Sequence, residues 1–241
     1  MSPREEAVFV GRYLGPTLEK AGLDAKIFCY DHNWDHPEMA AAVLSDPEAS
    51  KWLAGSAWHH YAGEPGIMSR IKEQFPSKDV WFTEGGSGRW IGKGTFSGNF
   101  REGMSMAVSI MQNQARSLVL WNIALDGNNG PIVFPNTANY GLVRIDVDSA
   151  TGKGSLSQTE RASLYVLSHF SKFISPGSRR IGMTIDGSDL PGVAFRNPDG
   201  SSAAVFWNPY FSDLSIRAGI GADQWIVPIP SHSAVTVVFD R

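Results

Sequence analysis

One glutamate in this sequence stands where a catalytic group is expected. The stretch Asp79–Gly88 reads Asp-Val-Trp-Phe-Thr-Glu-Gly-Gly-Ser-Gly, and its aromatic and β-branched residues predict a short buried strand that ends at Glu84. The glycines that follow allow a turn that few other residues permit. In parallel barrels, catalytic groups lie at the carboxyl ends of such strands. A glutamate that only caps the next turn would have the same local sequence, so this stretch alone leaves both interpretations open.

Polar or aromatic clusters also follow the other strands that the sequence predicts, at 26–30, 56–58 and 117–120. These clusters are Asp31 with Asn33, then His59, His60 and Tyr61, and finally Trp121 with Asn122. Predicted helices at 2–22, 39–44, 67–75, 100–115 and 161–173 alternate with the strands, which is typical of a parallel sheet with crossover helices. Because parallel strands end at the same edge of a sheet, we expect the clusters to form one site.

The pattern changes after Pro176-Gly177. Six short β-rich segments follow, separated by Gly, Pro, Asn, Asp and Ser: Arg180–Ile185, Gly192–Arg196, Ala203–Trp207, Leu214–Arg217, Gln224–Ile229 and Ala234–Phe239. Such segments predict an antiparallel domain, most simply a β-sandwich. We therefore expect an α/β domain over residues 1–176 and a β-sandwich domain over residues 177–241.

Other kinds of site find little support. His59 and His60 would face opposite sides of a strand, and there is no His-Glu-x-x-His, cysteine pair or Asp-rich loop, so we predict no metal and no cofactor. The spacing of a serine hydrolase elbow is missing. A net charge of −3 without a Lys/Arg cluster disfavours nucleic acid. Neither a membrane span nor an apolar signal region is predicted, and the single cysteine, Cys29, is predicted to be a buried thiol.

Carboxylate chemistry beside aromatic side chains remains. Glycoside hydrolysis needs two carboxyl groups, one on each side of the anomeric carbon, and Glu84 is the candidate nucleophile. His59 and Tyr61 are two residues apart, so on a strand both would reach into one pocket. The alternatives are a hydrogen-bonded core role for His59 and plain packing for Tyr61. Trp121 fits either a platform for a sugar ring or a filler of the core.

The strand-end clusters belong to a set of motifs that runs through nearly the whole chain. The motifs are Asp31-His32-Asn33, His59-His60-Tyr61, Thr83-Glu84-Gly85, Trp121-Asn122, Gly130-Pro131 and the run from His169 to Gly177. In this order and spacing the chain resembles glycoside hydrolase family 30, the glucosylceramidase-like O-glycosyl hydrolases. The resemblance implies the C-terminal half of a (β/α)8 barrel, strands five to eight, followed by an antiparallel β-sandwich.

The resemblance also implies a function and roles for six residues. It implies hydrolysis of β-linked sugars with retention of configuration, and hence a carbohydrate or glycolipid substrate. Glu84 matches the family's nucleophile. The other matches are substrate-binding positions: Asp31, His59, Tyr61, Trp121 and Asn136. His60 departs from glucosylceramidase, which has a tryptophan there, so the side of the site that binds the leaving group is expected to differ.

One expected residue is absent from the sequence. The family's acid/base is a Glu in an Asn-Glu pair, and these 241 residues contain no such pair. We therefore expect a fragment of a β-glycosidase that carries the nucleophile, with a non-catalytic carbohydrate-binding protein and a truncated structural product as alternatives. Open edges at Lys26–Tyr30 and Ser117–Leu120 would then favour a homo-oligomer or a complementing N-terminal half. Family members are often secreted or lysosomal, but this sequence does not indicate a compartment.

Overall fold

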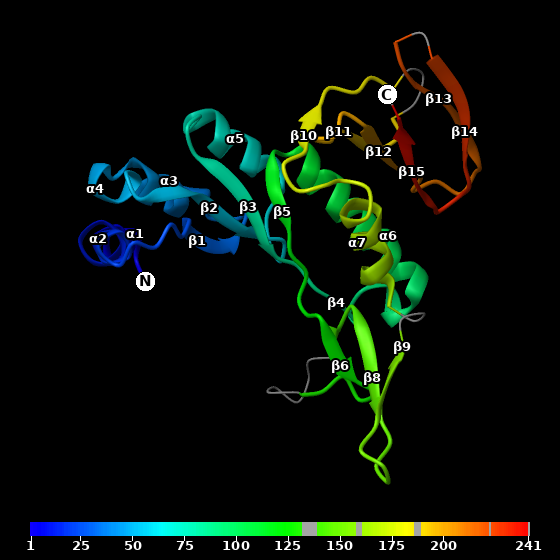
Figure 1. Cartoon of the computed structure of the whole chain (residues 1–241), viewed down its shortest axis with the longest axis horizontal. Coiled ribbons are helices and arrows are strands. Elements are labelled where there is room, and N and C mark those ends of the chain that lie inside the picture. The colour runs from blue at the N-terminus through cyan, green and yellow to red at the C-terminus, as the bar shows by residue number, and fades with distance from the viewer. Residues whose placement is uncertain (132–138, 158–160, 186–188, 222, 241) are drawn as a thin grey trace. The chain divides into compact units, whose positions relative to one another are not determined.

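The computed structural model describes residues 1–131, 139–157, 161–185, 189–221 and 223–240. The chain divides into two compact units (Figure 1). The first unit comprises Met1–Gly85 and Asn113–Leu120, and the second comprises Gly86–Gln112 and Trp121–Arg241. Glu84 and Trp121, both predicted to act on one substrate, therefore belong to different units.

The first unit opens on a helix, as the sequence predicts. Ser2 caps α1 (Pro3–Phe9) in a capping box, because its hydroxyl accepts from the backbone N–H of Glu5 at 3.3 Å and its own N–H donates to the Glu5 carboxylate at 2.7 Å. A π-helical segment, Val10–Leu14, joins α1 to α2 (Gly15–Lys20). Sequence periodicity did not indicate this wider turn. Val10, in this segment, is buried, whereas Val8 in α1 is exposed.

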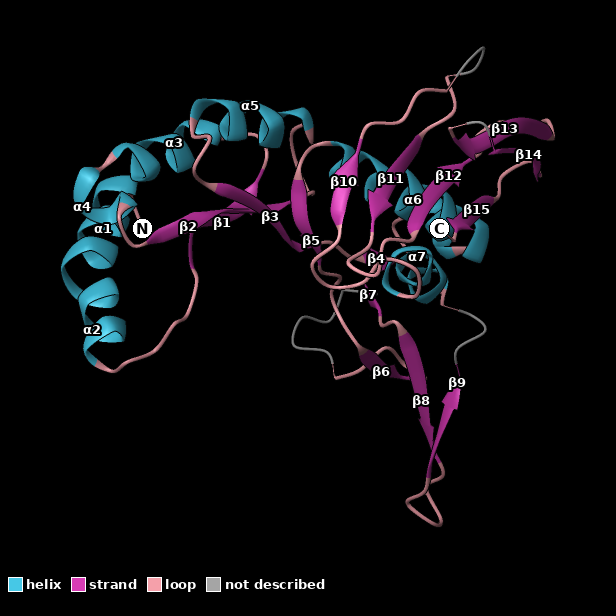
Figure 2. Cartoon of the chain, turned by 45° about the horizontal axis from the view of Figure 1, so that its top comes forward, coloured by secondary structure: helices cyan, strands magenta, loops and turns pink. Residues whose placement is uncertain are grey.

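A four-stranded parallel sheet forms the centre of the first unit. Its strands lie in the order β1 (Ile27–Asn33), β2 (Leu53–His59), β3 (Asp79–Glu84) and β5 (Ala115–Leu118). The crossover helices are α3 (Pro37–Ser45), α4 (Pro47–Ser50) and α5 (Gly66–Gln74), and Figure 2 shows α3 and α5 along one side of the strands. Residues such as Cys29, Trp58 and Phe82 are fully buried in this unit, so the strand ends stand on a packed core.

The second unit contains the β-sandwich that the sequence predicts. One antiparallel sheet has the order β10 (Arg179–Ile181), β11 (Gly192–Arg196), β12 (Ser202–Trp207) and β15 (Ala234–Phe239). The other pairs β13 (Leu214–Ile220) with β14 (Asp223–Ile229). A buried cluster that includes Ala194, Phe206, Ala218 and Ile229 combines residues of both sheets. The six predicted β-segments thus correspond to six strands.

Two helices of the second unit pack on this sheet. Helix α6 (Phe96–Gln112) contacts β11 and β12, and α7 (Ala162–Ser171) contacts α6 and β15. A hydrogen bond of 3.0 Å from the Trp207 indole to the Ser105 hydroxyl ties α6 to β12. Both helices were predicted. Their packing shows that apolar periodicity identifies a buried face without identifying what covers it.

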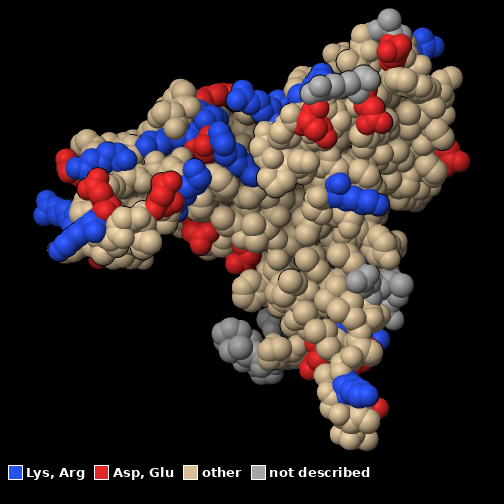
Figure 3. All heavy atoms as spheres, viewed as in Figure 1, with Lys and Arg blue, Asp and Glu red and all other residues tan. Residues whose placement is uncertain are grey.

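The loops after the first unit's strands carry strands that the sequence did not predict. A short pair joins β4 (Ser87–Gly88) to β7 (Asn139–Tyr140). A three-stranded sheet has the order β6 (Ala124–Asp126), β8 (Val143–Val147) and β9 (Gly154–Ser157). Figure 1 shows β8 and β9 as a hairpin at the lower end of the second unit. On the molecular face in Figure 3, basic and acidic side chains are interspersed over α1–α5.

Candidate active site

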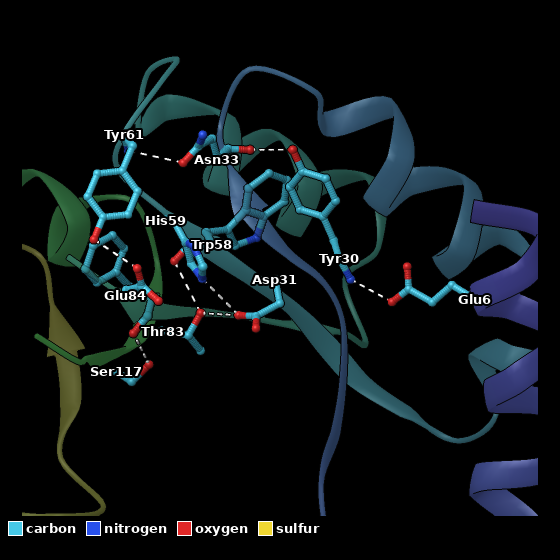
Figure 4. Close-up of polar contacts among 11 residues, drawn as sticks. Glu6, Tyr30, Asp31, Asn33, Trp58, His59, Tyr61, Thr83, Glu84 and Ser117 are labelled. Atoms are coloured by element: carbon cyan, nitrogen blue, oxygen red, sulfur yellow. Dashed lines mark hydrogen bonds and ion pairs between the residues drawn. The ribbon is translucent and has the colours of Figure 1, made fainter. Parts of the chain in front are cut away.

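The candidate site lies at the carboxyl ends of β1, β2 and β3, entirely within the first unit (Figure 4). Parallel pairing brings the strand ends into register, since Asn33 pairs with His59 and His59 pairs with Glu84. The sheet therefore places residues that are distant in sequence at one edge. This is the juxtaposition that the strand-end clusters predicted for Asp31, His59, Tyr61 and Glu84.

Asp31 reaches the site through an irregularity in β1. Tyr30 and Asp31 both have left-handed backbone angles, with φ of 78° and 50°, and the pairing of β1 with β2 shifts register between Tyr30 and His32. Such a bulge re-aims the side chain of the extra residue. The Asp31 carboxylate is aimed across the strand ends, where Oδ1 accepts a hydrogen bond of 2.7 Å from the Thr83 hydroxyl and lies 3.1 Å from Nε2 of His59.

Asp31, His59 and Thr83 thus cross-link the ends of three strands (Figure 4). The His59 side chain is only 13% exposed, whereas that of Asp31 is 65% exposed. The contacts with Thr83 and His59 fix Oδ1 of Asp31, while the rest of this carboxylate is open to solvent. A fixed, exposed carboxylate beside an imidazole is suited to accept hydrogen bonds from the hydroxyl groups of a ligand.

Glu84 is held by a tyrosine from the neighbouring strand end. The Tyr61 hydroxyl donates to Oε1 of Glu84 at 3.0 Å, and the Tyr61 N–H donates to the side-chain oxygen of Asn33 at 3.3 Å. Burial raises the pKa of Tyr61, and the hydrogen bond to Glu84 and the charge of that carboxylate raise it further. Tyr61 therefore remains a neutral donor at physiological pH and orients the Glu84 carboxylate.

Two neighbours hold this pair in place. The His60 ring packs on the Tyr61 ring with centroids 4.5 Å apart and also contacts Phe82. Burial lowers the pKa of His60, an effect that the Glu84 backbone carbonyl partly offsets, and Nδ1 of His60 is buried without a partner among the described residues. A Cβ atom on Gly85 would lie 2.9 Å from the Phe82 ring, so this close approach requires glycine after Glu84.

Two of the predicted substrate-binding residues are not among the described residues of the first unit. Trp121 belongs to the second unit, where it is 53% exposed and forms a bridge with Gly86. Its peptide bond to Asn122 is cis. Asn136 lies outside the described residues. The roles of both residues therefore stay predictions from the resemblance.

Sequence reasoning gave no role to Thr83 or Asn33, although both belong to the motifs. Thr83 precedes Glu84 on β3 and links that strand to Asp31, while Asn33 holds the backbone of Tyr61. The sequence could have indicated them only by their position, since a hydroxyl side chain at Thr83 adjoins Glu84 and an amide side chain at Asn33 lies close to Asp31. In the described part of the chain, no three His, Cys, Asp or Glu side chains are grouped so that they could hold a metal ion. None of the helices described is long and apolar enough to cross a membrane.

Comparison with known proteins points to one family. The sequence pattern of the glycosyl hydrolase family 30 TIM-barrel domain matches residues 1–174, and that of the glycosyl hydrolase family 30 beta sandwich domain matches residues 177–237. Both matches agree with the parallel sheet and the antiparallel sandwich described above.

Individual relatives are glycosidases. The chain is 27% identical over 242 residues to endo-1,6-beta-D-glucanase neg1 of Aspergillus fumigatus, covering 97% of this chain and 46% of that protein. It is 30% identical over 226 residues to lysosomal acid glucosylceramidase of Mus musculus, covering 89% of this chain and 42% of the relative. The structure of the endo-beta1,6-glucanase BT3312 matches 98% of this chain and 53% of that chain, with a TM-score of 0.87 and 28% identity. This chain therefore spans about half the length of the relatives it matches.

Proposed function

Since this chain belongs to glycosyl hydrolase family 30, we propose that it carries the nucleophile of a retaining β-glycosidase, which forms a glycosyl-enzyme ester on Glu84. One observation carries the proposal: the Tyr61 hydroxyl holds the Glu84 carboxylate at 3.0 Å, at the end of a buried parallel strand. A nucleophilic carboxylate must be ionised and held in the direction of attack. The tyrosine hydroxyl serves both ends, since a hydrogen bond to the charged form favours it and fixes its orientation.

The remaining residues are assigned to substrate binding. Asp31 and His59 would bind hydroxyl groups of the sugar that is being transferred, since they present a carboxylate and an imidazole 3.1 Å apart at the same strand ends. Trp121 would stack on a sugar ring, and Asn136 would approach it from the loop that follows. These two assignments rest on the family resemblance alone.

The proposed substrate is a β-linked glucoside. The relatives include endo-1,6-beta-glucanases and a glucosylceramidase, whose names share a β-linked glucose but differ in what the glucose is attached to. His60, which packs beside Tyr61, stands where the family resemblance has a tryptophan in glucosylceramidase. We therefore propose glucose for the transferred sugar, with a carbohydrate or glycolipid leaving group.

The proposed reaction has two steps. In the first, Glu84 attacks the anomeric carbon, the bond to the leaving oxygen breaks, and an acid protonates that oxygen; in the second, the same residue as base activates water. The resemblance puts this acid/base in an Asn-Glu pair, which these 241 residues do not contain. Assayed by itself, this chain should perform the first step only with leaving groups that need no proton. General acid–base help is worth roughly 10²–10⁴-fold, so ordinary glucosides should react negligibly.

The test is mass spectrometry of the protein after incubation with dinitrophenyl β-glucoside, whose phenolate leaves without protonation. We expect a mass increase of one glucosyl group, located on Glu84 by peptide mapping. Azide needs no base, so it should release the label as β-glucosyl azide. The matched control is Glu84→Gln, which has the same shape and no nucleophilic oxygen anion.

Two other outcomes would decide against parts of this proposal. Rapid hydrolysis of an alkyl β-glucoside would show that another residue supplies the proton. An unlabelled Glu84 with no azide product would favour the second candidate, a non-catalytic carbohydrate-binding protein. The absence of an Asn-Glu pair is the observation that keeps this candidate in view.

We also propose that the domains divide near residue 176. A separate proposal is that further strands pair with the two edge strands of the first unit's parallel sheet. Strands β1 and β5 are the two edges of the described sheet, and edge strands of a parallel sheet invite further pairing. The partner would be a second copy or a complementing N-terminal half. Sedimentation velocity of the purified chain tests the first case, in which a dimer is expected; a monodisperse monomer with a cooperative melt would contradict it.

A further inference from the structure

Two consecutive residues of β1 adopt a backbone conformation that strands of L-residues avoid. Tyr30 and Asp31 have φ of 78° and 50°, in the left-handed region, and neither is glycine. Each such residue is unfavourable on its own and persists only where the surroundings hold it. Asp31 is the residue whose carboxylate this conformation aims at Thr83 and His59. What holds the backbone therefore also determines where the carboxylate lies.

A side chain from helix α1 holds the first of these residues. Oε1 of Glu6 accepts the backbone N–H of Tyr30 at 2.8 Å, as Figure 4 shows. Among the described strands, β1 pairs only with β2, and the acceptor of this N–H comes from a helix. A carboxylate is a stronger acceptor for this N–H than a neutral carbonyl. The side chain of Tyr30 is held as well, since its hydroxyl donates to the backbone carbonyl of Asn33 at 2.5 Å. This bond links the two sides of the bulge.

Glu6 is itself firmly placed. Helix α1 begins in the capping box of Ser2 and Glu5, its residue Ala7 is buried, and so is Val10 at the start of the π-helical segment that follows. Glu6 is half-buried beside them, and its side chain points from the helix to β1 (Figure 4). The acceptor for the Tyr30 N–H is therefore part of a rigid element, which is the condition for fixing a bulge.

We propose that Glu6 is a positioning residue for Asp31: by accepting the Tyr30 N–H it holds the Tyr30–Asp31 bulge, and so keeps the Asp31 carboxylate at the sugar-binding edge. The inference rests on the proposed function for its consequence in catalysis. Glu6 contacts neither Glu84 nor Tyr61 in any described hydrogen bond, so its effect must pass through β1. Without its acceptor, the Tyr30 N–H would turn toward water and Asp31 would relax toward the extended region.

Three variants separate this role from a general effect on the helix. Glu6→Ala removes the acceptor. Glu6→Gln keeps an oxygen at the same place and loses the charge. Glu5→Ala is the matched control, because it alters the same helix at its cap without touching Tyr30.

Two readouts are needed, one of them independent of activity. Amide hydrogen exchange at Tyr30 reports the hydrogen bond directly. In Glu6→Ala we expect exchange at this amide to rise about tenfold or more, since the bond involves a charged acceptor. In Glu6→Gln it should rise less than in Glu6→Ala, because the amide oxygen still accepts this N–H, and in Glu5→Ala it should not rise relative to the other amides of β1.

The second readout is the rate at which dinitrophenyl β-glucoside labels Glu84. We expect Glu6→Ala to raise the half-saturating concentration about tenfold with little change in the limiting rate, because Asp31 binds the sugar and does not touch the reacting bond. Glu6→Gln should restore most of the loss, and Glu5→Ala should label like the wild type. In an Asp31→Ala background, Glu6→Ala should have no further effect, since both act through one group.

The outcomes are distinct. Unchanged exchange at Tyr30 in Glu6→Ala would overturn the inference. So would faster exchange with unchanged labelling, or a Glu6→Ala effect that persists undiminished in the Asp31→Ala background. If the wild type itself is not labelled, the proposed function fails, and exchange at Tyr30 alone then decides whether Glu6 holds the bulge.

Discussion

The two ends of the parallel sheet in the first unit are built on different principles. At the amino ends of the strands, Asp79 accepts from Lys72 at 3.0 Å and from Arg116 at 2.8 Å, which joins α5, β3 and β5. Lys78 donates to the backbone carbonyl of Leu53 at 2.8 Å, at the start of β2. These charged groups pair with one another or with backbone carbonyls, although the backbone is irregular here too, since Gln114 has a φ of 74° and register shifts occur between Ile27 and Phe28 and between Val80 and Phe82.

At the carboxyl ends of the same strands, irregular backbone and polar atoms without a described partner coincide with the candidate site residues. Tyr30 and Asp31 are left-handed, the pairing of β2 with β3 shifts between Trp58 and His59, and Nδ1 of His60 is buried without a described partner. Strain and incomplete polar pairing persist at functional sites because the rest of the structure holds them. The difference teaches that one end of the sheet stabilises the unit, while the other end presents side chains to a ligand.

The largest expected effect tests the functional end. Glu84→Gln should leave the fold intact and reduce labelling by dinitrophenyl β-glucoside by at least about 10³-fold, because losing a nucleophile costs more than losing any one binding contact. Circular dichroism checks the fold, and mass spectrometry checks the label. Unchanged labelling in this variant would move the chemistry to another residue.

Tyr61→Phe should have the next largest effect. It removes the donor that orients the carboxylate, and the loss of one fixed donor at a reacting group commonly costs roughly 10²-fold. The effect should appear in the limiting labelling rate, unlike that of Glu6→Ala, because Tyr61 contacts Glu84, the proposed nucleophile, at 3.0 Å. Tyr13→Phe is a matched control on an exposed helical tyrosine and should label normally. A limiting rate like that of the wild type would reduce Tyr61 to a packing residue.

A substitution at the amino ends of the strands should lower stability and leave labelling unchanged. Asp79→Asn weakens two ion pairs in a side chain that is only 23% exposed, so we expect the free energy of unfolding to fall by about 1–2 kcal/mol. Labelling per folded molecule should be unchanged. Glu48→Gln is the control, since its ion pair with Lys51 is exposed and should contribute less than about 0.5 kcal/mol. Slower labelling by folded Asp79→Asn would show that the two ends are coupled.

Sequence alone predicted the architecture that depends on repeating patterns. The strands and helices of the first unit and the six strands of the sandwich follow apolar periodicity and turn residues, which are local signals. It placed Asp31, His59, Tyr61 and Glu84 together because parallel strands must end at one edge. The hairpin of β8 and β9 was missed because its residues, such as Val147 and Leu156, are exposed and show no buried face.

The details of the site could not be predicted, for a physical reason. The bulge at Tyr30 and Asp31 uses no glycine, so no residue type indicates it, and it exists because Glu6, 24 positions away, accepts the Tyr30 N–H. The pairing of Thr83 with Asp31 likewise joins residues 52 positions apart. Such contacts are set by tertiary structure, whereas sequence patterns report the local environment of each residue.

The smallest expected effect is a change in how the stability of the protein depends on pH, through His60 at the carboxyl ends of the strands. Burial lowers the pKa of His60 below its ordinary value of 6.5, with a further lowering by His59, while the backbone carbonyl and the charge of Glu84 act in the opposite direction. The unfolded chain therefore binds this proton at a higher pH than the folded chain does. Well above pH 6.5, His60 is neutral in both states and does not reduce the free energy of unfolding. Below this pH the unfolded chain binds the proton first, so the free energy of unfolding falls as the pH drops.

His169 gives a matched case in the second unit, because burial lowers its pKa too, but it bonds to the Thr236 hydroxyl at 2.9 Å. The measurement is the free energy of unfolding in urea at about pH 7.5 and about pH 5.5, values that span the titration of an ordinary histidine. His60→Phe and His169→Phe should each reduce the loss of stability between the two pH values. Only His60→Phe should also alter the labelling of Glu84, because its ring supports Tyr61. A pH dependence unchanged by His60→Phe would mean that this buried imidazole is hydrated or paired, and the functional end of the sheet would then be less strained than its geometry indicates.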